Sequence, residues 1–396
     1  MPPVYFWLIL LLLAVKNKSA PIVLNNFPRL IKRITMPGKD ESEYAQSGVS
    51  SFGAKTALGR ILEHLLPTWK FNPRYPVIGG KEYYASVIDI GQGQGIAFCT
   101  DGVGTKIMIA EMLDKYDTIG IDCVAMNVND IICVGARPAS LVDYIACSFT
   151  DDKIFSDLAK GLAEGARQSE ISISGGEISQ MREVVNGIDL IGSCIGTVSL
   201  DKVNNGSDIV PGNLIVGLGS SGIHSNGLTL ARKILLGETN EQQRKRVNQY
   251  NETLRTTFGL ELLTPTRIYV RQILEIMESG VDVKAVAHIT GGGFCNLNRV
   301  LANNIRFVLS DLPEPQAIFQ LIQEIGKIQV SEMHDVFNMG VGMCVIVENS
   351  DDADQVKAIA QKHGTPAKGI GFIEACKEKE VIIPRYNLVG RGGSFN

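Results

Sequence analysis

The sequence lacks the features that mark several large classes of enzyme. No two of its eight cysteines have C-x-x-C spacing, and no H-x-x-x-H pair is present, so a zinc enzyme has no support. The G-x-x-x-x-G-K-[ST] loop of P-loop nucleotide-binding proteins is absent. The G-x-S-x-G elbow of serine hydrolases is absent too. Most cysteines lie in apolar runs, which predicts buried, reduced thiols and a reducing compartment.

Long hydrophobic runs are scarce as well. The run at residues 4–15 is too short to cross a bilayer, and basic residues follow it instead of preceding it as in a secretory signal. We expect residues 1–35 to be a non-structural leader, with targeting or anchoring as the alternative. The body is expected to be soluble and cytoplasmic, with no membrane partner.

The chain has little excess charge, with a formal net charge of −4. Its first 35 residues hold five basic and no acidic residues, so the remaining body is the more acidic part. An acidic body does not attract a phosphate backbone, so we expect no nucleic-acid partner. A local anion site stays open, because backbone N–H groups can form one without net charge.

The pattern of elements predicts an α/β (α+β) fold of two domains. A chain of 396 residues with 45% hydrophobic residues is too long for one ordinary core. Strands and helices alternate in both halves, and we place the domains at residues 36–200 and 211–380. Thr264 and Pro265 are expected to open a helix as cap and first residue, and residues 238–252 to form a surface excursion. A strand at 171–174 is expected to end at Gly175-Gly176-Glu177. We also expect a hairpin turn at residues 91–93, an amphipathic helix at 153–168 with one apolar stripe (Phe155, Leu158, Leu162 and Ala166), and a strand at 341–347.

Three carboxylates lie beside small residues at the expected ends of strands or helices: Asp101, Asp130 and Glu177. Mg²⁺ prefers carboxylate and phosphate oxygens, and neighbouring glycines let a triphosphate approach the backbone. Each acid alone is better explained as a solvated turn residue or helix cap, whereas three of them in one domain make a metal site an equal alternative. Lys106 is a candidate phosphate contact, with a surface lysine as the alternative.

Two glycine-rich loops follow strands in the second half. Residues 217–222 match G-x-G-x-x-G, but no helix opens at the third glycine, so a phosphate monoester suits this loop better than a dinucleotide. Residues 288–293, H-I-T-G-G-G, form a second phosphate-type loop. His224 and His288 are candidates for proton transfer or substrate hydrogen bonds, and structural roles stay open for both.

Taken in order, these motifs resemble the phosphoribosylformylglycinamidine cyclo-ligase (AIR synthetase) family. The resemblance runs from about Tyr44 to Gly371 and rests on T-D-G-V-G-T-K (100–106), V-N-D (128–130), G-G-E (175–177), S-S-G-I-H-S-N-G (220–227), T-P-T-R-I-Y (264–269), H-I-T-G-G-G (288–293) and F-N-M-G-V-G-M (337–343). It implies a two-domain homodimer paired through the first domain. It also implies an ATP- and Mg²⁺-dependent ligase that closes formylglycinamidine ribonucleotide to aminoimidazole ribonucleotide, with release of ADP and phosphate.

The resemblance also implies roles for individual residues. Asp101, Asp130 and Glu177 would hold the metal, and His224 and His288 would be catalytic. The nucleotide would contact Thr100, Asp101, Gly102, Gly104, Thr105, Lys106, Asn129 and Asp130. The substrate would contact Ser220, Ser221, His224, Ser225, Asn226, His288, Thr290, Gly291, Gly292 and Gly293.

The sequence departs from the family pattern at two places. Residues 44–50 lack the lysine that the family often has there, and Gln180 replaces a second acid after Glu177, so neither position is given a role. Other ATP-using members of the superfamily remain alternatives, such as thiamin-monophosphate kinases, selenophosphate synthetases and hydrogenase-maturation factors. A non-catalytic nucleotide-binding paralogue is a further alternative.

Overall fold

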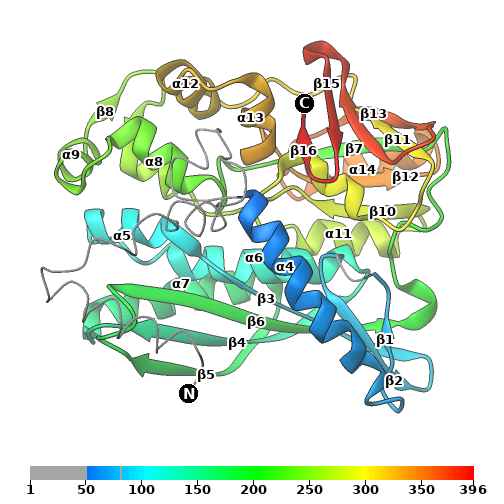
Figure 1. Cartoon of the computed structure of the whole chain (residues 1–396), viewed down its shortest axis with the longest axis horizontal. Coiled ribbons are helices and arrows are strands. Elements are labelled where there is room, and N and C mark those ends of the chain that lie inside the picture. The colour runs from blue at the N-terminus through cyan, green and yellow to red at the C-terminus, as the bar shows by residue number, and fades with distance from the viewer. Residues whose placement is uncertain (1–50, 81–82) are drawn as a thin grey trace, which may run out of the picture.

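The computed structural model describes residues 51–80 and 83–396. The expected leader, residues 1–35, and the segment 44–50 lie outside this part of the chain. The described chain forms two layered bodies, one built on a six-stranded sheet and the other on an eight-stranded sheet, stacked one above the other in Figure 1. The α/β (α+β) class expected from the sequence is confirmed.

The first sheet has the strand order β1-β2-β3-β6-β4-β5. Its strands are β1 (Val77–Ile78), β2 (Ser86–Gly91), β3 (Gln94–Gly102), β4 (Arg137–Cys147), β5 (Ser172–Gln180) and β6 (Ile188–Ser199). Neighbouring strands are antiparallel except β4 and β5, which are parallel. Gln92 and Gly93 both have positive φ, 56° and 72°, so β2 and β3 form the tight hairpin predicted from the sequence.

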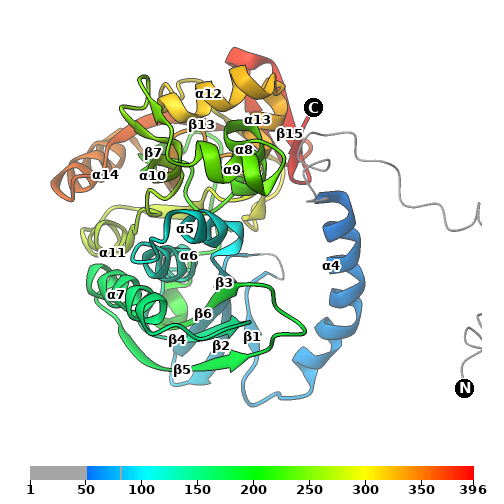
Figure 2. The same ribbon diagram turned by 90° about the vertical axis from the view of Figure 1, so that its left-hand side faces the viewer.

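Helices cover one face of this sheet, and a further helix lies apart from it (Figure 2). The helices of the first body are α4 (Ser51–Leu65), α5 (Ile107–Leu113), α6 (Ile119–Cys133) and α7 (Asp152–Ser169), with short 3-10 turns η2 (Leu66–Lys70), η3 (Gly104–Lys106) and η4 (Leu200–Lys202). The predicted apolar stripe of α7 is confirmed, because Leu158, Leu162 and Ala166 are buried. A Cβ at Gly120 would lie 2.1 Å from the Leu162 backbone nitrogen, so glycine allows the close packing of α6 on α7.

The second sheet has the order β10-β12-β7-β13-β11-β14-β15-β16. Its strands are β7 (Leu214–Gly219), β10 (Val283–His288), β11 (Ile305–Val308), β12 (Val341–Val347), β13 (Ala367–Ala375), β14 (Glu380–Ile383), β15 (Leu388–Arg391) and β16 (Ser394–Phe395). Every residue of β12 is buried, which marks it as a central core strand. A separate small hairpin pairs β8 (Tyr250–Asn251) with β9 (Thr256–Thr257).

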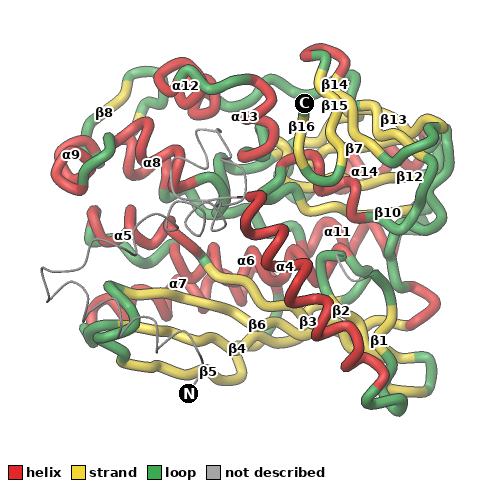
Figure 3. Tube along the Cα trace, viewed as in Figure 1, coloured by secondary structure: helices red, strands yellow, loops and turns green. Residues whose placement is uncertain are grey.

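Helices and short turns pack around the second sheet, as the secondary-structure colouring of Figure 3 shows. They are α8 (Leu228–Leu236), α9 (Asn240–Arg246), α10 (Phe258–Leu262), α11 (Val270–Glu278), η5 (Gly293–Arg299), α12 (Ala317–Gly326), α13 (Val330–Val336), α14 (Ser350–Lys362) and η6 (Pro384–Tyr386). No described helix has the length and apolar character needed to span a membrane.

The structure corrects two local predictions and agrees with a third. β5 continues through Gly175 and Gly176 to Gln180, so no turn closes it. Residues 238–252 are mostly exposed, as expected of a surface excursion, and they contain α9, which starts at a capping box formed by Thr239 and Gln242. The helix expected from Thr264 begins only at Val270.

Tertiary hydrogen bonds explain the late start of α11. The backbone N–H of Thr266 donates to Asp122 Oδ1 at 2.7 Å, and that of Tyr269 donates to Asn129 Oδ1 at 3.0 Å. Both acceptors lie on α6 of the first domain. The cap signal at Thr264 is therefore overridden by bonds between the domains, which keep residues 264–269 out of the helix.

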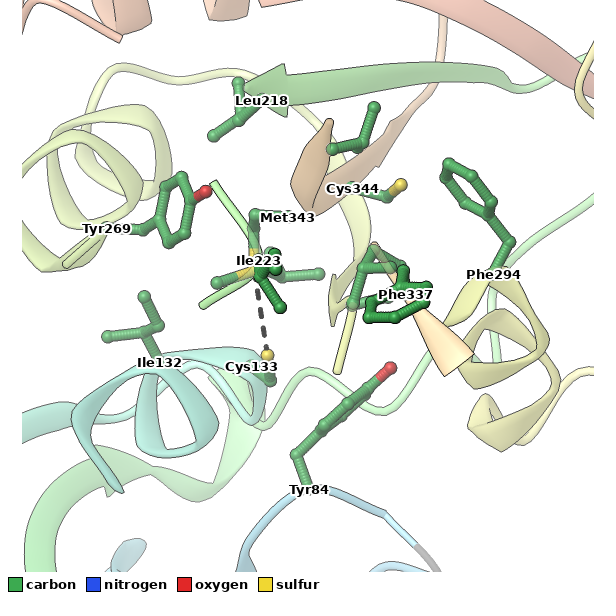
Figure 4. Close-up of a cluster of buried hydrophobic side chains, with 14 of the residues drawn as sticks. Tyr84, Ile132, Cys133, Leu218, Ile223, Tyr269, Phe294, Phe337, Met343 and Cys344 are labelled. Carbon is green, nitrogen blue, oxygen red and sulfur yellow. Dashed lines mark hydrogen bonds between the residues drawn. The ribbon is translucent and has the colours of Figure 1, made fainter. Parts of the chain in front are cut away.

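The two domains share one continuous apolar core (Figure 4). Cys133, at the end of α6, lies with its Sγ 3.9 Å from Met343 Sδ on β12. Tyr84 of the first domain lies near Phe294 of the second in the same cluster, and the Tyr84 hydroxyl donates to the Asn296 carbonyl at 3.0 Å. The relative position of the domains is thus fixed by packing, so side chains at their contact are held in place.

Candidate active site between the domains

Three titratable side chains from distant parts of the sequence meet at the contact between the domains. Asp101 lies near the end of β3, Asp130 in the last turn of α6, and His288 at the end of β10. His288 Nδ1 lies 2.8 Å from Asp130 Oδ1. Burial, followed by the nearby Asp130 carboxylate, raises the pKa of Asp101 to about 6. We name Asp101, Asp130 and His288 the interdomain site.

The two acids of this site fit a hard divalent cation. Two neighbouring carboxylates at a partly buried position repel one another, and a cation removes that repulsion. Mg²⁺ is commonly held by one or two carboxylates together with phosphate oxygens, so a third protein ligand is not needed. Within the described residues, no group of three or more His, Cys, Asp or Glu side chains is arranged to hold a metal ion.

Glu177 does not join the other two acids within one chain. Its strand β5 is separated from β3 by β6 and β4, and strand spacing places it roughly 14 Å from Asp101 across the sheet. Glu177 is exposed in the middle of the edge strand. The predicted three-acid metal site is therefore reduced to two acids in a single subunit.

The raised pKa of Asp101 predicts a pH-dependent stability in metal-free protein. In the unfolded chain this carboxyl ionises near its ordinary pKa of about 3.9, whereas in the folded chain it holds its proton to about pH 6. The folded state therefore binds more protons between these values, so the free energy of unfolding should fall as pH rises from about 4 to 6. Urea titrations in EDTA should show that Asp101→Asn removes this part of the slope. An unchanged slope would contradict the assigned cause.

Lys106 has a structural place instead of the expected nucleotide contact. Its side chain is fully buried, and its Nζ donates to Asp122 Oδ1 at 2.8 Å and to the Thr264 carbonyl at 2.6 Å. Burial lowers the pKa of Lys106, and the ion pair with Asp122 opposes that shift. The expectation that Lys106 lines the nucleotide site does not match this placement.

Asn129 also joins the domains instead of facing a ligand. Its Nδ2 donates to the Arg267 carbonyl at 2.9 Å, while its Oδ1 accepts from the Tyr269 N–H. The side chain is fully buried. Its role as a nucleotide contact is therefore corrected to that of a bond between α6 and residues 264–269.

Parts of the T-D-G-V-G-T-K segment (100–106) are exposed where β3 ends and η3 begins. The Thr100 side chain is exposed and its Oγ1 donates to the Gly192 carbonyl, and the Gly102 N–H donates to Asp101 Oδ1. Gly104 is exposed with a φ of +65°, a conformation that favours glycine. Thr105 Oγ1 lies 2.9 Å from Thr229 Oγ1, so this loop touches the first turn of α8.

Hydrogen bonds anchor residues 220–225 to neighbouring segments of both domains. Ser221 Oγ donates to the Pro265 carbonyl at 2.6 Å, and Ser225 Oγ donates to Asp122 Oδ1 at 3.2 Å. Ser220 is buried, and its carbonyl accepts from Gln316 Nε2. These serines bring the loop against α6, so the expected substrate loop does reach the first domain.

Three buried polar atoms of the expected substrate residues have no hydrogen-bond partner in the described part of the chain: His224 Nδ1, Asn226 Nδ2 and His288 Nε2. Buried polar groups are almost always satisfied, so unpartnered ones in one region call for a ligand or water. His224 Nε2 accepts from the Ser221 N–H at 3.1 Å, and burial holds the pKa of His224 well below its ordinary range. His224 is therefore neutral near pH 7, with its proton on Nδ1.

The glycine turn after His288 depends on the absence of side chains. Gly291 is exposed and Gly292 has a φ of +95°, while Thr290 Oγ1 accepts from Asn296. A Cβ at Gly293 would lie 1.8 Å from the His334 carbonyl oxygen, and its φ is +54°. The turn therefore cannot accept a side chain at Gly293 without moving.

Gly293→Ala is expected to destabilise the protein by about 2–4 kcal/mol, from the clash and the left-handed backbone together. Gly364→Ala is the matched control, because Gly364 also has a positive φ, +69°, but open space around its Cβ position. Its cost should stay near 1–2 kcal/mol. Urea unfolding of both variants measures the difference. Equal costs would show that the His334 contact does not restrict the turn.

Sequence reasoning missed Asp122 and Arg299. Asp122 organises the domain contact by accepting from Lys106, Ser225 and Thr266. An acid inside the buried apolar run of α6 was the available signal, since such acids are rarely buried without a partner. Arg299 is near enough to lower the pKa of Asp101, opposing the effect of burial. No local pattern marked it.

Comparison with known proteins defines the class. The profile "AIR synthase related protein, N-terminal domain" matches residues 83–198, and the corresponding C-terminal domain profile matches residues 210–384. Together they cover more than half of the chain, so it is a two-domain AIR synthase-related protein. The phosphoribosylformylglycinamidine cyclo-ligase of Methanothermobacter thermautotrophicus is 44% identical over 82% of this chain and 92% of its own length. The phosphoribosylformylglycinamidine cyclo-ligase of Pyrococcus furiosus is also 44% identical, over 80% of this chain and 91% of its own length. The chain belongs to the phosphoribosylformylglycinamidine cyclo-ligase family.

Solved structures share the fold at low identity. A HypE–HypF complex chain matches with a TM-score of 0.57 and 18% identity over 83% of this chain and 99% of the other. Thiamine-monophosphate kinase from Stenotrophomonas maltophilia matches with a TM-score of 0.54 and 16% identity, over 77% of this chain and 90% of the other. A chain of "T. maritima PurL complexed with ATP" matches with a TM-score of 0.52 and 17% identity, over 82% of this chain and 47% of the other. These likenesses support the two-domain architecture.

Proposed function

We propose that the interdomain site binds Mg²⁺-ATP and formylglycinamidine ribonucleotide and closes the imidazole ring of aminoimidazole ribonucleotide. The protein is an ATP-dependent ligase of purine biosynthesis that forms a C–N bond. The observation that carries the site assignment is the 2.8 Å contact between His288 and Asp130. It joins an acid of the first domain to the glycine loop of the second, where the two reactants have to meet.

The reaction requires that two ends of one substrate be held together. ATP activates the formyl oxygen by phosphorylation, the amidine nitrogen attacks the same carbon, and phosphate leaves with that oxygen. Bound Mg²⁺ would supply charge neutralisation for the phosphoryl oxygens, with Asp101 and Asp130 as its protein ligands. Holding the reacting atoms in contact is the main task of the protein, since an oriented intramolecular attack needs little further help.

The two histidines offer complementary hydrogen-bonding groups. His288 Nδ1 lies within hydrogen-bond distance of Asp130 Oδ1, and the tautomer that donates from Nδ1 leaves Nε2 as an acceptor. His224 instead offers a donor, because its Nε2 accepts from the Ser221 N–H and its Nδ1–H has no partner among the described residues. We assign His288 to accept from the amidine nitrogen and His224 to donate to a substrate oxygen.

A coupled assay tests this function. ADP should form only when formylglycinamidine ribonucleotide is supplied with Mg²⁺-ATP, and one phosphate should appear for each ADP. ADP formation with thiamin monophosphate or selenide instead would move the protein to another branch of the superfamily. Tight ATP binding without turnover on any of them would support a non-catalytic paralogue.

The eight free thiols suit a reducing compartment, so we place the activity in the cytoplasm.

A homodimer is part of the proposal, and the first sheet supports it. The face of this sheet that points away from α6 and α7 carries exposed apolar side chains: Phe98, Val142, Tyr144 and Ile195. Phe98 and Ile195 are direct cross-strand partners, which makes the patch continuous from β3 to β6. Exposed apolar patches of this kind commonly mark protein contacts. A second copy would cover the patch by the same face, as two-fold symmetry requires.

Ile195→Glu should convert this dimer to monomers, because it places a charge at the centre of the apolar patch. Light scattering after size exclusion gives the mass directly. The exposed position Val184→Glu, on the loop after β5, is the control and should leave the mass unchanged. A wild-type monomer would contradict the dimer without touching the ligase assignment.

A further inference from the structure

A polar cavity of about 360 Å³ lies between the helices of the two domains, and Ser221 of the expected substrate loop lines part of it. Ile121 of α6 and Gln168 of α7 line it from the first domain. The second domain contributes, among others, Arg267, Arg271, Gln272, His363 and Thr365. Figure 2 shows α7, α11 and α14 together on the side of the molecule opposite α4.

This cavity is separated from the interdomain site by α6. Ile121 faces the cavity and Asp130 belongs to the interdomain site, nine positions further along the same helix. At about 100° per residue, nine positions amount to two and a half turns, so the two side chains leave α6 on opposite sides. None of Asp101, Asp130 and His288 lines the cavity.

The cavity has an excess of positive charge. No Asp or Glu lines it. Arg271 is paired with Glu170 at 3.1 Å and His363 with Glu275 at 2.8 Å. Within residues 51–80 and 83–396, Arg267 forms no ion pair with any carboxylate. Its charge is therefore not balanced by the described protein.

Arg267 also has donor groups to spare. Its Nε is buried and has no hydrogen-bond partner in the described structure. Its Nη1 reaches only the Gly364 carbonyl at 3.4 Å and Thr365 Oγ1 at 3.5 Å, both long contacts. A guanidinium presents several N–H donors in a planar fork that matches the oxygens of a phosphate. A buried donor without a partner in a cavity of this size indicates a missing acceptor.

We propose that this cavity is a second anion site, which takes a phosphate group through Arg267 and Arg271 between the two domains. The ligand is either inorganic phosphate or the phosphate of a small monoester, since both present the same oxygens. Pockets of about 300 Å³ and more hold small ligands, so a monoester fits as well as the free ion.

Occupation of this site is coupled to the substrate loop through one residue. The Arg267 backbone N–H points at His224 Nε2 at 3.5 Å, and the Arg267 carbonyl accepts from Asn129 on α6. A phosphate that draws the Arg267 side chain into a fixed position therefore also fixes the backbone that contacts His224. The anion acts as a bridge that holds both domains and positions the substrate loop.

Calorimetric titration of the full chain with inorganic phosphate, and in parallel with ribose 5-phosphate, tests the proposal. Arg267→Gln should weaken binding by about tenfold or more, because a charged hydrogen-bond donor is lost. Arg271→Gln, at an exposed position, should weaken it several-fold and serves if Arg267→Gln does not fold. Tighter binding of ribose 5-phosphate would identify a monoester as the ligand, and equal binding would identify the free ion.

Arg385→Gln is the matched control, because Arg385 is an exposed arginine of the same domain paired with Glu314. It should bind phosphate like the wild type. A crystal structure in phosphate should show the anion at Arg267. Phosphate found only at the interdomain site, or both cavity variants binding like the wild type, would overturn the proposal. The titration needs no turnover, so a failed ADP assay would leave this result standing.

Discussion

Asp130→Asn should lower the rate of ADP formation by about 10²–10³-fold, the loss typical when one fixed charge-stabilising group is removed. Asp130 provides both the carboxylate that helps raise the pKa of Asp101 and a hydrogen-bond partner that orients His288. Its side chain is 18% exposed at the domain contact, so the amide fits the same space. The fold should therefore remain intact, and steady-state kinetics with varied Mg²⁺ should show a raised requirement for the metal.

Asp117→Asn is the control for this change. Asp117 is an exposed acid of the same domain that pairs with Lys115, so its loss should leave the rate unchanged within about twofold. If Asp130→Asn retains full activity at every Mg²⁺ concentration, Asp130 is neither a metal ligand nor the partner that orients His288. If circular dichroism shows that the variant has lost activity because it unfolds, the expectation that the fold remains intact is wrong.

Lys106→Met should reduce the free energy of unfolding by about 3–5 kcal/mol, which is the cost of leaving one member of a buried ion pair uncompensated. The Lys106–Asp122 pair is fully buried on both sides. Asp122 Oδ2 already has no hydrogen-bond partner among the described residues, so removal of Lys106 leaves this carboxylate with less compensation still. Urea unfolding followed by fluorescence and circular dichroism measures the change.

Two further variants serve as controls for the Lys106→Met result. Lys368→Met removes an exposed ion pair with Asp311 and should cost less than about 1 kcal/mol. The double variant Lys106→Met, Asp122→Asn should recover part of the lost stability, because the uncompensated charge is removed with its partner. A cost for Lys106→Met equal to that of Lys368→Met would contradict the buried pair and reopen Lys106 as a ligand contact.

Periodicity and motif order were enough to predict the main elements. The hairpin of β2 and β3, the stripe of α7 and the fully apolar strand β12 carry their signals within ten to twenty residues. The family resemblance then predicted one site for the acids and glycine loops; the structure brings Asp130 into contact with His288 but leaves Glu177 on the edge strand β5. Such local signals survive folding because burial reinforces them.

The errors arise where distant residues decide the local structure. β5 runs on through Gly175 and Gly176 because pairing with β4 continues there. The segment before α11 stays non-helical because Asp122 and Asn129 accept hydrogen bonds from its backbone. Lys106 and Asn129 were predicted to contact the nucleotide because of the motifs around them, whereas their side chains form hydrogen bonds at the domain contact. Sequence spacing does not show on which side of a helix a partner domain will lie.

A structure with Mg²⁺ and a non-hydrolysable ATP analogue tests the central claim most directly. The account predicts a metal ion within about 2.1 Å of oxygens from both Asp101 and Asp130, bridging to the nucleotide phosphates beside residues 100–105. It also predicts that Lys106 keeps its bond to Asp122. A metal bound away from both acids, or a nucleotide seated outside the contact between the domains, would contradict the account.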